Sequence, residues 1–271
     1  MSTEARNPRS FGLDKMSARE IVRLMNEEEH SVMRALAQAE EPIAIAVEKA
    51  GEAFRRGGRI FYVGSGTSGR IASADAAEMP PTFGLEPDRF IAIVSGGASA
   101  TDRAIEDAED DPTASIDILN LMGLNTDDIL IGIAASGTTP FVVSAIKHAS
   151  QKGVWTCGIA NNKKSPVLLE AEHAILLETG AEVLTGSTRL KAGTAQKLAL
   201  NRISTGAMVL NGKVIENLMV DVKAKNAKLR DRCIRIFCEL TNATKDEAAE
   251  ILQSCDWSIR DAMERNKAAS S

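Results

Sequence analysis

The stretch that most constrains the fold runs from Ile60 to Gly84. A β-branched and aromatic run enters a turn of Gly, Ser and Thr, and an alanine-rich helical run leaves it. This order predicts a buried strand that is connected to the N-terminus of a helix by a loop of small residues. Such a loop offers free backbone N–H groups, hydroxyls and the positive end of a helix dipole, which suit an anion, typically phosphate. We expect the double proline Pro80-Pro81 to stop the helix just after Glu78.

The same order of strand and helix recurs along the chain. Five short apolar runs are separated by helical patterns, and they cover residues 59–63, 90–94, 129–134, 154–159 and 173–177. This alternation predicts an α/β fold in which a parallel sheet is covered by helices on both faces. In that architecture ligands bind beyond the carboxyl ends of the strands, where the Gly/Ser/Thr loops lie.

Helical patterns flank the alternating section at both ends. We expect one helix over residues 14–30, where Ser17 and Glu20 have the spacing of a capping box, and a second over residues 31–56. Three short helices are expected beyond residue 225.

Composition excludes several classes of function. The formal net charge is −5 and no long block of Lys and Arg occurs, which argues against nucleic-acid binding and against a membrane-surface role. No apolar run reaches transmembrane length and the N-terminus lacks a signal-peptide core, so we expect a cytoplasmic protein. The four cysteines and three histidines show no disulfide, metal or triad spacing. We therefore expect no metal and look to other groups for the chemistry.

A second hydroxyl-rich loop, Ser136-Gly137-Thr138-Thr139, follows the third apolar run. Two loops of this type at strand ends of one sheet favour a phosphate-bearing ligand over two structural caps. Neither loop has the Gly-Lys-Ser/Thr ending of a P-loop. The first does read Gly64-x-Gly66-x-x-Gly69, the spacing of a dinucleotide fingerprint. However, the second strand ends in Ser-Gly-Gly rather than in an acid, so NAD is the poorer interpretation.

Two acidic positions are candidates for acid–base chemistry. Glu78 stands beside Met79 and near Phe83, so we expect it to lose hydration, which raises the pKa of its carboxyl group and favours a proton donor. Glu106 and Glu109 are three residues apart on a helix expected over residues 100–109, and either could be a base. The alternatives are a glutamate at an exposed helix end and a solvated acidic face.

Arg189 and Lys191 are cations at the start of a helix, where the dipole disfavours positive charge. Such a local mismatch suggests an external anion or carboxylate, because proteins tend to break local rules at functional sites. The alternative is a plain surface position.

Five segments together closely resemble the N-acetylmuramic acid 6-phosphate etherases: Gly64–Arg70, Asp75–Gly84, Ile133–Gly137, Gly186–Lys197 and Asn217–Val222. The resemblance covers about residues 3–232. It implies a SIS-type three-layer α/β/α sandwich with a five-stranded parallel sheet, usually dimeric, and a small C-terminal helical appendage similar to a ubiquitin-associated fold. On this basis the chain divides into an N-terminal arm with helices (1–50), a SIS phosphosugar-binding domain (51–222) and the appendage (223–271).

The resemblance implies a lyase that works without a cofactor. That family cleaves the D-lactyl ether of N-acetylmuramic acid 6-phosphate to N-acetylglucosamine 6-phosphate and D-lactate, in the recycling of cell-wall sugars. Its proton-donor glutamate falls on Glu78 and its second catalytic glutamate on Glu109. From their charge alone, Arg189 or Lys191 is expected to meet the lactate carboxylate. The other residues assigned to the substrate are Ser65, Gly66, Thr67, Ser68, Ser136, Gly137 and Thr139.

Two other functions are compatible with these motifs. One is a non-catalytic phosphosugar sensor like the glucokinase regulatory protein, and the other is an aldose–ketose isomerase. The chain also departs from the usual etherase pattern at four positions, which bear on substrate range and phosphate affinity but leave both glutamates in place. It has Thr138 where the family commonly has Arg, Met79 for Cys, Leu190 for Met, and Asn161 in a segment that is more usually Cys-Asn.

Overall fold

The computed structural model describes residues 3–97, 99–102, 107–222, 224 and 226–269. The chain forms two compact units, which are described separately here. The first comprises Met1–Ala76 and Asp88–Ala207, and the second comprises Ala77–Pro87 and Met208–Ser271. The functional division at residues 50 and 222 stays a prediction. Within the described residues, no helix is both long and apolar enough to span a membrane.

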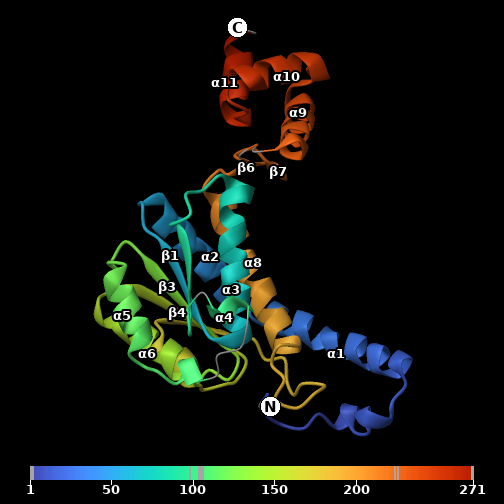
Figure 1. Ribbon diagram of the computed structural model, residues 1–271, viewed down its shortest axis with the longest axis vertical. Coiled ribbons are helices and arrows are strands. Elements are labelled where there is room, and N and C mark those ends of the chain that lie inside the picture. Colours follow the sequence, from blue (N-terminus) through green and yellow to red (C-terminus); the bar gives the residue numbers. More distant parts are fainter. Residues whose placement is uncertain (1–2, 98, 103–106, 223, 225, 270–271) are drawn as a thin grey trace. The chain divides into compact units, whose positions relative to one another are not determined.

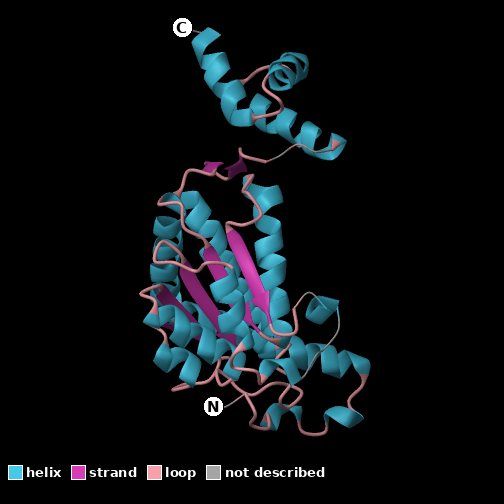
Figure 2. Cartoon of the chain, turned by 60° about the vertical axis from the view of Figure 1, so that its left-hand side comes forward, coloured by secondary structure: helices cyan, strands magenta, loops and turns pink. Residues whose placement is uncertain are grey.

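A five-stranded sheet forms the centre of the first unit (Figures 1 and 2). All neighbouring strands are parallel, and their order is β2-β1-β3-β4-β5. The bounds are β1 Ile60–Gly64, β2 Phe90–Val94, β3 Ile129–Ala134, β4 Trp155–Ala160 and β5 His173–Leu176. The predicted α/β class and parallel sheet are confirmed, and each expected strand lies within a residue or two of its observed position.

Helices cover both faces of this sheet. Phe61 and Val63 pack into a core with Phe141 of α6 (Pro140–Gln151). Helices α5 (Ala114–Leu121) and α7 (Pro166–Glu170) pack against α6 on that side. Tyr62 points to the other face, where its hydroxyl donates to Asp75 of α3 at 3.1 Å. This alternation along β1 produces the three layers that were expected.

Two N-terminal helices are present as predicted, but the first begins at Ala18 rather than at residue 14, and they divide at a different residue. Two 3-10 turns, η1 (Pro8–Ser10) and η2 (Leu13–Lys15), precede α1 (Ala18–Gln38) and α2 (Glu40–Arg55). The capping box of Ser17 and Glu20 is confirmed at the start of α1. The expected boundary near residue 30 is wrong. The helices meet at Ala39, and Pro42 lies in the first turn of α2, where a missing N–H costs no helical hydrogen bond.

The expectation that the double proline stops the helix after Glu78 is also wrong. Helix α3 runs from Gly66 to Phe83, through Pro80 and Pro81. A proline in a helix loses its own bond to the residue four positions earlier and its ring crowds that carbonyl, so a helix can continue past it only at a cost. The chain leaves the helix at Gly84, whose N–H donates to the carbonyl of Pro80 at 3.0 Å.

The segment between β2 and β3 carries the candidate base. Helix α4 (Ser99–Asp102) follows β2, and a 3-10 turn, η3 (Asp107–Glu109), ends in Glu109. Glu106 lies outside the described residues, so the expectation that it shares a helix face with Glu109 stays a prediction.

The second unit has a small core of its own. It contains a two-stranded antiparallel hairpin, β6 (Val214–Ile215) and β7 (Leu218–Met219), which the sequence analysis did not predict. The three expected helices are confirmed as α9 (Ala227–Thr241), α10 (Lys245–Ser254) and α11 (Ile259–Ala269). Phe237, Leu252 and Ile259 are fully buried between them.

Candidate active site

The sheet has one point at which the direction of the connections reverses. From β1 the chain passes to the edge strand β2, whereas from β3 it passes to β4 on the opposite side. Strands β1 and β3 are neighbours, with Gly64 in register with Ile133. Because the strands are parallel, the loops after both of them lie at the same edge of the sheet. Such a switch point, at the carboxyl ends of the strands, is where open α/β sheets bind ligands.

The loop after β1 brings the start of α3 close to the strand. A Cβ atom on Gly64 would lie 2.8 Å from the nitrogen of Gly69, and one on Gly69 would lie 2.9 Å from the oxygen of Gly64. Any larger residue at either position would therefore separate the helix from the strand. The Ser65 hydroxyl is buried and has no hydrogen-bond partner among the described residues. An unpaired hydroxyl at this position is suited to a polar ligand.

Ser68, which was assigned to the substrate, is tied into a buried chain of hydrogen bonds. Its hydroxyl donates to Oε1 of Gln196 at 2.8 Å, and Nε2 of Gln196 donates to Oδ1 of Asn161 at 3.0 Å. The Asn161 amide in turn donates to the carbonyl of Leu177 at 2.7 Å. This chain links the start of α3 to α8 (Lys191–Leu210) and to the ends of β4 and β5. The positioning roles of Gln196 and Asn161 were missed, although both stood within segments that the sequence analysis quoted.

The loop after β3 is closed by its own hydroxyls and by the N-terminal segment. The Ser136 hydroxyl accepts from the N–H of Thr138 at 3.2 Å and from its hydroxyl at 3.1 Å. Asn162 donates through Nδ2 to the carbonyl of Ser136 at 3.3 Å and to the hydroxyl of Thr3 at 3.0 Å. Gly137 adopts φ +73°, and a Cβ atom there would lie 2.1 Å from the Ser165 hydroxyl oxygen. Thr139 precedes α6, and its side chain makes no cap to that helix.

A cavity of about 420 Å³ opens beside this second loop. Ser136 and Thr138 line it on one side, and Lys163 and Lys164 line it on another. Lys163 is paired with Glu178 at 2.8 Å, whereas Lys164 is exposed and adopts φ +55°. The connection after β4 therefore brings two cations to the loop in which Thr138 stands. These two lysines were not among the site residues predicted from the sequence.

The two candidate catalytic glutamates lie in different compact units. Glu109 ends η3, which packs against α6 in the first unit, and its side chain is exposed. Glu78 lies on α3 in the second unit and is also exposed. The expectation that its apolar neighbours desolvate Glu78 is wrong for the single chain. Met79 and Phe83 share the buried face of the helix, and Glu78 lies off that face.

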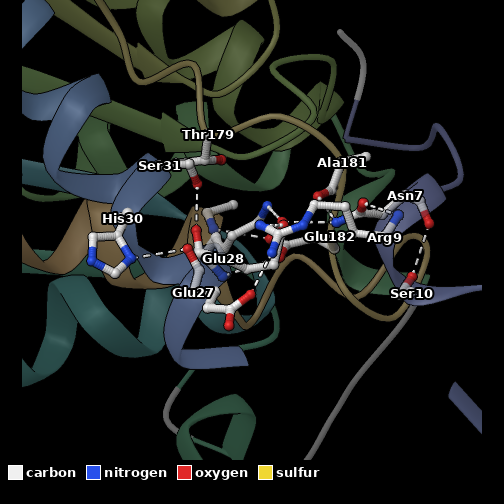
Figure 3. A network of polar contacts seen from close by, with 12 residues as sticks. Asn7, Arg9, Ser10, Glu27, Glu28, His30, Ser31, Thr179, Ala181 and Glu182 are labelled. Atoms are coloured by element: carbon white, nitrogen blue, oxygen red, sulfur yellow. Dashed lines mark hydrogen bonds and ion pairs between the residues drawn. The ribbon is translucent and has the colours of Figure 1, made fainter. Parts of the chain in front are cut away.

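The unfavourable position of a cation at the start of α8 is compensated inside the protein by Glu28 (Lys191 Nζ–Glu28 Oε2), and Figure 3 shows the polar contacts of Glu28 with its neighbours. Lys191 is buried, and its Nζ lies 2.6 Å from Oε2 of Glu28 on α1. Glu28 also accepts from Nδ2 of Asn7 at 2.7 Å and from Arg9 at 2.9 Å. The expectation that Lys191 meets an external anion is therefore wrong, because Glu28 is its anion. Arg189 is exposed and keeps its predicted role as a contact for a carboxylate.

Burial and hydrogen bonding act in opposite directions on the two carboxylates of this network. Burial works to raise the pKa of Glu28, but hydrogen bonds from Lys191 and Asn7 outweigh it and hold that pKa below the ordinary value. Glu182 caps α8 by accepting from the N–H groups of Lys191 at 3.1 Å and Ala192 at 2.9 Å. Its burial raises the pKa of Glu182 despite these bonds. Within the described residues, no three His, Cys, Asp or Glu side chains form a group that could hold a metal ion.

Comparison with known proteins identifies relatives over nearly the whole chain. Residues 42–150 match the glucokinase regulatory protein N-terminal SIS domain, and residues 101–203 match the SIS domain. The N-acetylmuramic acid 6-phosphate etherase of Geobacillus thermodenitrificans is 48% identical over 97% of this chain and 89% of its own length. The etherase of Lactobacillus acidophilus is 45% identical over 96% of this chain and 87% of its own length.

Solved structures share the fold at lower sequence identity. The phosphoheptose isomerase of Neisseria gonorrhoeae aligns with a TM-score of 0.51 and 21% identity, over 72% of this chain and 100% of that chain. An Escherichia coli CFT073 protein in complex with A5P aligns with a TM-score of 0.54 and 15% identity, over 74% of this chain and 97% of that chain. These likenesses concern the fold alone. The identity to the curated relatives extends over almost every residue, and on that ground this chain belongs to the N-acetylmuramic acid 6-phosphate etherase family.

Proposed function

We propose that this protein is a carbon–oxygen lyase that cleaves the D-lactyl ether of N-acetylmuramic acid 6-phosphate. The products are N-acetylglucosamine 6-phosphate and D-lactate, and the reaction belongs to the recycling of cell-wall amino sugars. The observation that carries the proposal is the meeting of two hydroxyl-rich loops at the switch point between β1 and β3, in a chain of the etherase family.

The 6-phosphate is assigned to these two loops. The unpaired hydroxyl of Ser65 and the backbone N–H groups of Gly66 and Thr67, at the start of α3, would face one side of the phosphate. Ser136, Gly137 and Thr139 would face the other side. The Ser68 hydroxyl donates to Gln196, so Ser68 would act on the phosphate through its backbone N–H group. Arg189 is assigned to the carboxylate of the lactyl group.

The chemistry is assigned to the two glutamates. In the open-chain sugar the hydrogen on C2 is acidic, because C2 is next to the aldehyde. Glu109 removes this proton as general base, and the lactyl oxygen leaves C3 with a proton from Glu78. The resulting C2–C3 double bond is conjugated with the aldehyde. Water then adds at C3 with Glu78 as the base, and C2 regains a proton.

Glu78 has to be shielded from water to be an effective donor in this scheme. Its side chain is exposed in the single chain, so the bound sugar, or a second copy of the chain, has to provide the dry surroundings. We propose a homodimer in the cytoplasm with the phosphosugar as its only ligand and no cofactor. The oligomeric state is measured directly by analytical ultracentrifugation.

The roles of the two glutamates are separated by two readouts on one substrate. D-lactate release measures the whole reaction, and exchange of the C2 hydrogen in deuterated water measures the base alone. Glu78→Gln is expected to lower lactate release by about 10²–10⁴-fold while exchange at C2 persists. Glu109→Gln is expected to lower both. Glu250→Gln, an exposed position on α10, is the matched control and should change neither.

The same assays decide between the alternatives. Lactate release by the wild-type protein excludes an aldose–ketose isomerase and a non-catalytic sensor. A wild-type protein that binds the phosphosugar without releasing lactate would refute the proposal. Full lactate release by Glu78→Gln would remove Glu78 from its role but leave the lyase activity standing.

A further inference from the structure

Helix α3, which carries Glu78, crosses from the first compact unit into the second two residues before Glu78. The boundary between the two units falls within α3, between Ala76 and Ala77, so Glu78 belongs with the C-terminal part of the chain. Pro80 and Pro81 follow inside the helix. Because proline has no N–H group, the carbonyls of Ala76 and Ala77 lose their helical partners. The last turns of α3 are therefore joined to the rest of the helix by fewer hydrogen bonds than an ordinary helix end.

The end of this helix runs against the backbone of Asp221. Gly84 follows the last residue of α3 and adopts φ +67°. A Cβ atom on Gly84 would lie only 2.2 Å from the backbone oxygen of Asp221. The contact is thus between two backbones, and it fixes the position of the segment six residues beyond Glu78. It lies wholly within the second unit.

The Asp221 carboxylate is held by two cations from different elements of this unit. Lys213, just before β6, contacts Oδ2 at 3.0 Å, and Arg260 of α11 contacts Oδ1 at 2.9 Å. Arg260 also donates to the carbonyl of Gly212 at 2.7 Å. The Asp221 carboxylate therefore links the segment before β6 to α11, and the backbone of the same residue contacts Gly84 at the end of α3.

The ion pairs of Asp221 border an open cavity. A cavity of about 610 Å³ is lined by Gly84, Lys213, Asp221 and Arg260. The apolar core of the unit, around Phe237, is built by the three helices together with Val220 and Val222, which flank Asp221. Val220 and Val222, the neighbours of Asp221, are buried, so the ion pairs of Asp221 act together with apolar contacts in holding the segment around Gly84.

We propose that Asp221 and Arg260 are positioning residues for the acid of the reaction. They hold the end of α3, and with it Glu78, so that the C-terminal helices contribute to catalysis rather than forming an independent binding module. This inference rests on the proposed role of Glu78. A misplacement of about 1 Å caused far from the reacting atoms can cost about 10²-fold in rate, which sets the scale of the expected effect.

The test uses the full chain with Arg260→Ala and Asp221→Asn. Each variant is expected to lower kcat for D-lactate release by about 10–10²-fold. The C2 hydrogen exchange that Glu109 performs should persist, and the affinity for N-acetylglucosamine 6-phosphate, which is held by the loops of the first unit, should not change. Arg260→Lys, which keeps a cation beside Asp221, should recover part of kcat. Arg235→Ala removes an exposed ion pair with Asp231 on α9 in the same unit and is the matched control.

The outcomes separate this inference from the proposed function. Unchanged kcat in both variants would overturn it. Equal losses in lactate release, C2 exchange and product affinity would also overturn it, because they would indicate a general loss of structure. Circular dichroism and urea unfolding check the fold, and Asp221→Asn keeps the side-chain volume if Arg260→Ala is too unstable to purify. Failure of the proposed function would appear in the wild-type protein, as binding of the phosphosugar without lactate release, and failure of the role of Glu78 would appear as full lactate release by Glu78→Gln.

Discussion

The buried ion pair between Lys191 and Glu28 gives a prediction that can be worked out in detail. The Lys191 side chain is 3% exposed and the Glu28 side chain 9%, and they lie 163 residues apart in the sequence. We choose Lys191→Met, which keeps the length of the side chain and removes its charge. The variant leaves the Glu28 carboxylate buried with only Asn7 and Arg9 as partners.

The magnitude follows from these remaining contacts. Removing one member of a buried pair typically costs about 3–5 kcal/mol, because an uncompensated charge stays in a poorly solvated site. Asn7 and Arg9 still hold Glu28, so we expect the lower end, about 3 kcal/mol. For a chain of this size that loss corresponds to a fall in Tm of roughly 6–12 °C. Replacing both residues, with Lys191→Met and Glu28→Gln together, should recover much of it because no buried charge is then left alone.

The assay is a double-mutant cycle: urea unfolding at pH 7 of the wild type, Lys191→Met, Glu28→Gln and the double variant. This pH lies above the range in which Glu28 gains a proton. The pKa of Glu28 is lowered in the folded state, so its contribution is complete above the ordinary value of 4.5 and is lost as pH falls through the folded value. A cost of less than about 1 kcal/mol for Lys191→Met, with no recovery in the double variant, would refute the reasoning. A fully folded Lys191→Met protein that cannot release lactate would return Lys191 to the substrate.

Two further predictions concern the buried polar residues. Glu182→Gln should alter the pH dependence of the free energy of unfolding. The pKa of Glu182 is raised by burial, so the wild type should be most stable relative to the variant below pH 4.5 and should lose that advantage as pH rises through the pKa of the folded state. Urea unfolding of both proteins from pH 4 to about pH 7 measures this difference in the free energy of unfolding. A difference that does not change with pH would contradict the prediction. Gln196→Leu leaves Ser68 and Asn161 without their buried partner, which should cost about 2–6 kcal/mol by thermal unfolding. A loss within experimental error would show that the chain of hydrogen bonds does not stabilise the fold.

The elements of the first unit were largely predictable because their signals are local. Each strand is a short apolar run, and the capping box at Ser17 depends on a residue only three positions away. The continuation of α3 through Pro80 and Pro81 was not predictable in this way. Propensity gives the cost of a proline but not the contacts, such as that of Gly84 with Asp221, that keep the helix end in place.

The positions of the two hydroxyl-rich loops could be predicted from the sequence, whereas the pairing of the charged side chains could not. The hydroxyl residues follow strands, and the parallel sheet brings those strand ends to one edge. Whether a charge is already paired depends on residues far away in the sequence, and Glu28 could not be assigned to Lys191 from spacing. The exposure of Glu78 was inferable. Its apolar neighbours Met79 and Phe83 fall at helical spacing on another face, so their presence nearby in the sequence did not mean that they cover Glu78.

The contact between Thr3 and Asn162 has a practical consequence for work with this protein. Thr3 is fully buried, and Asn162 holds both this residue and the loop after β3 through one amide group. A purification tag fused ahead of Thr3 would start beside the proposed phosphate loop and could weaken substrate affinity without touching a catalytic side chain. Tags are therefore better fused after α11, and kinetic constants from N-terminally tagged protein should be compared with those of the cleaved form.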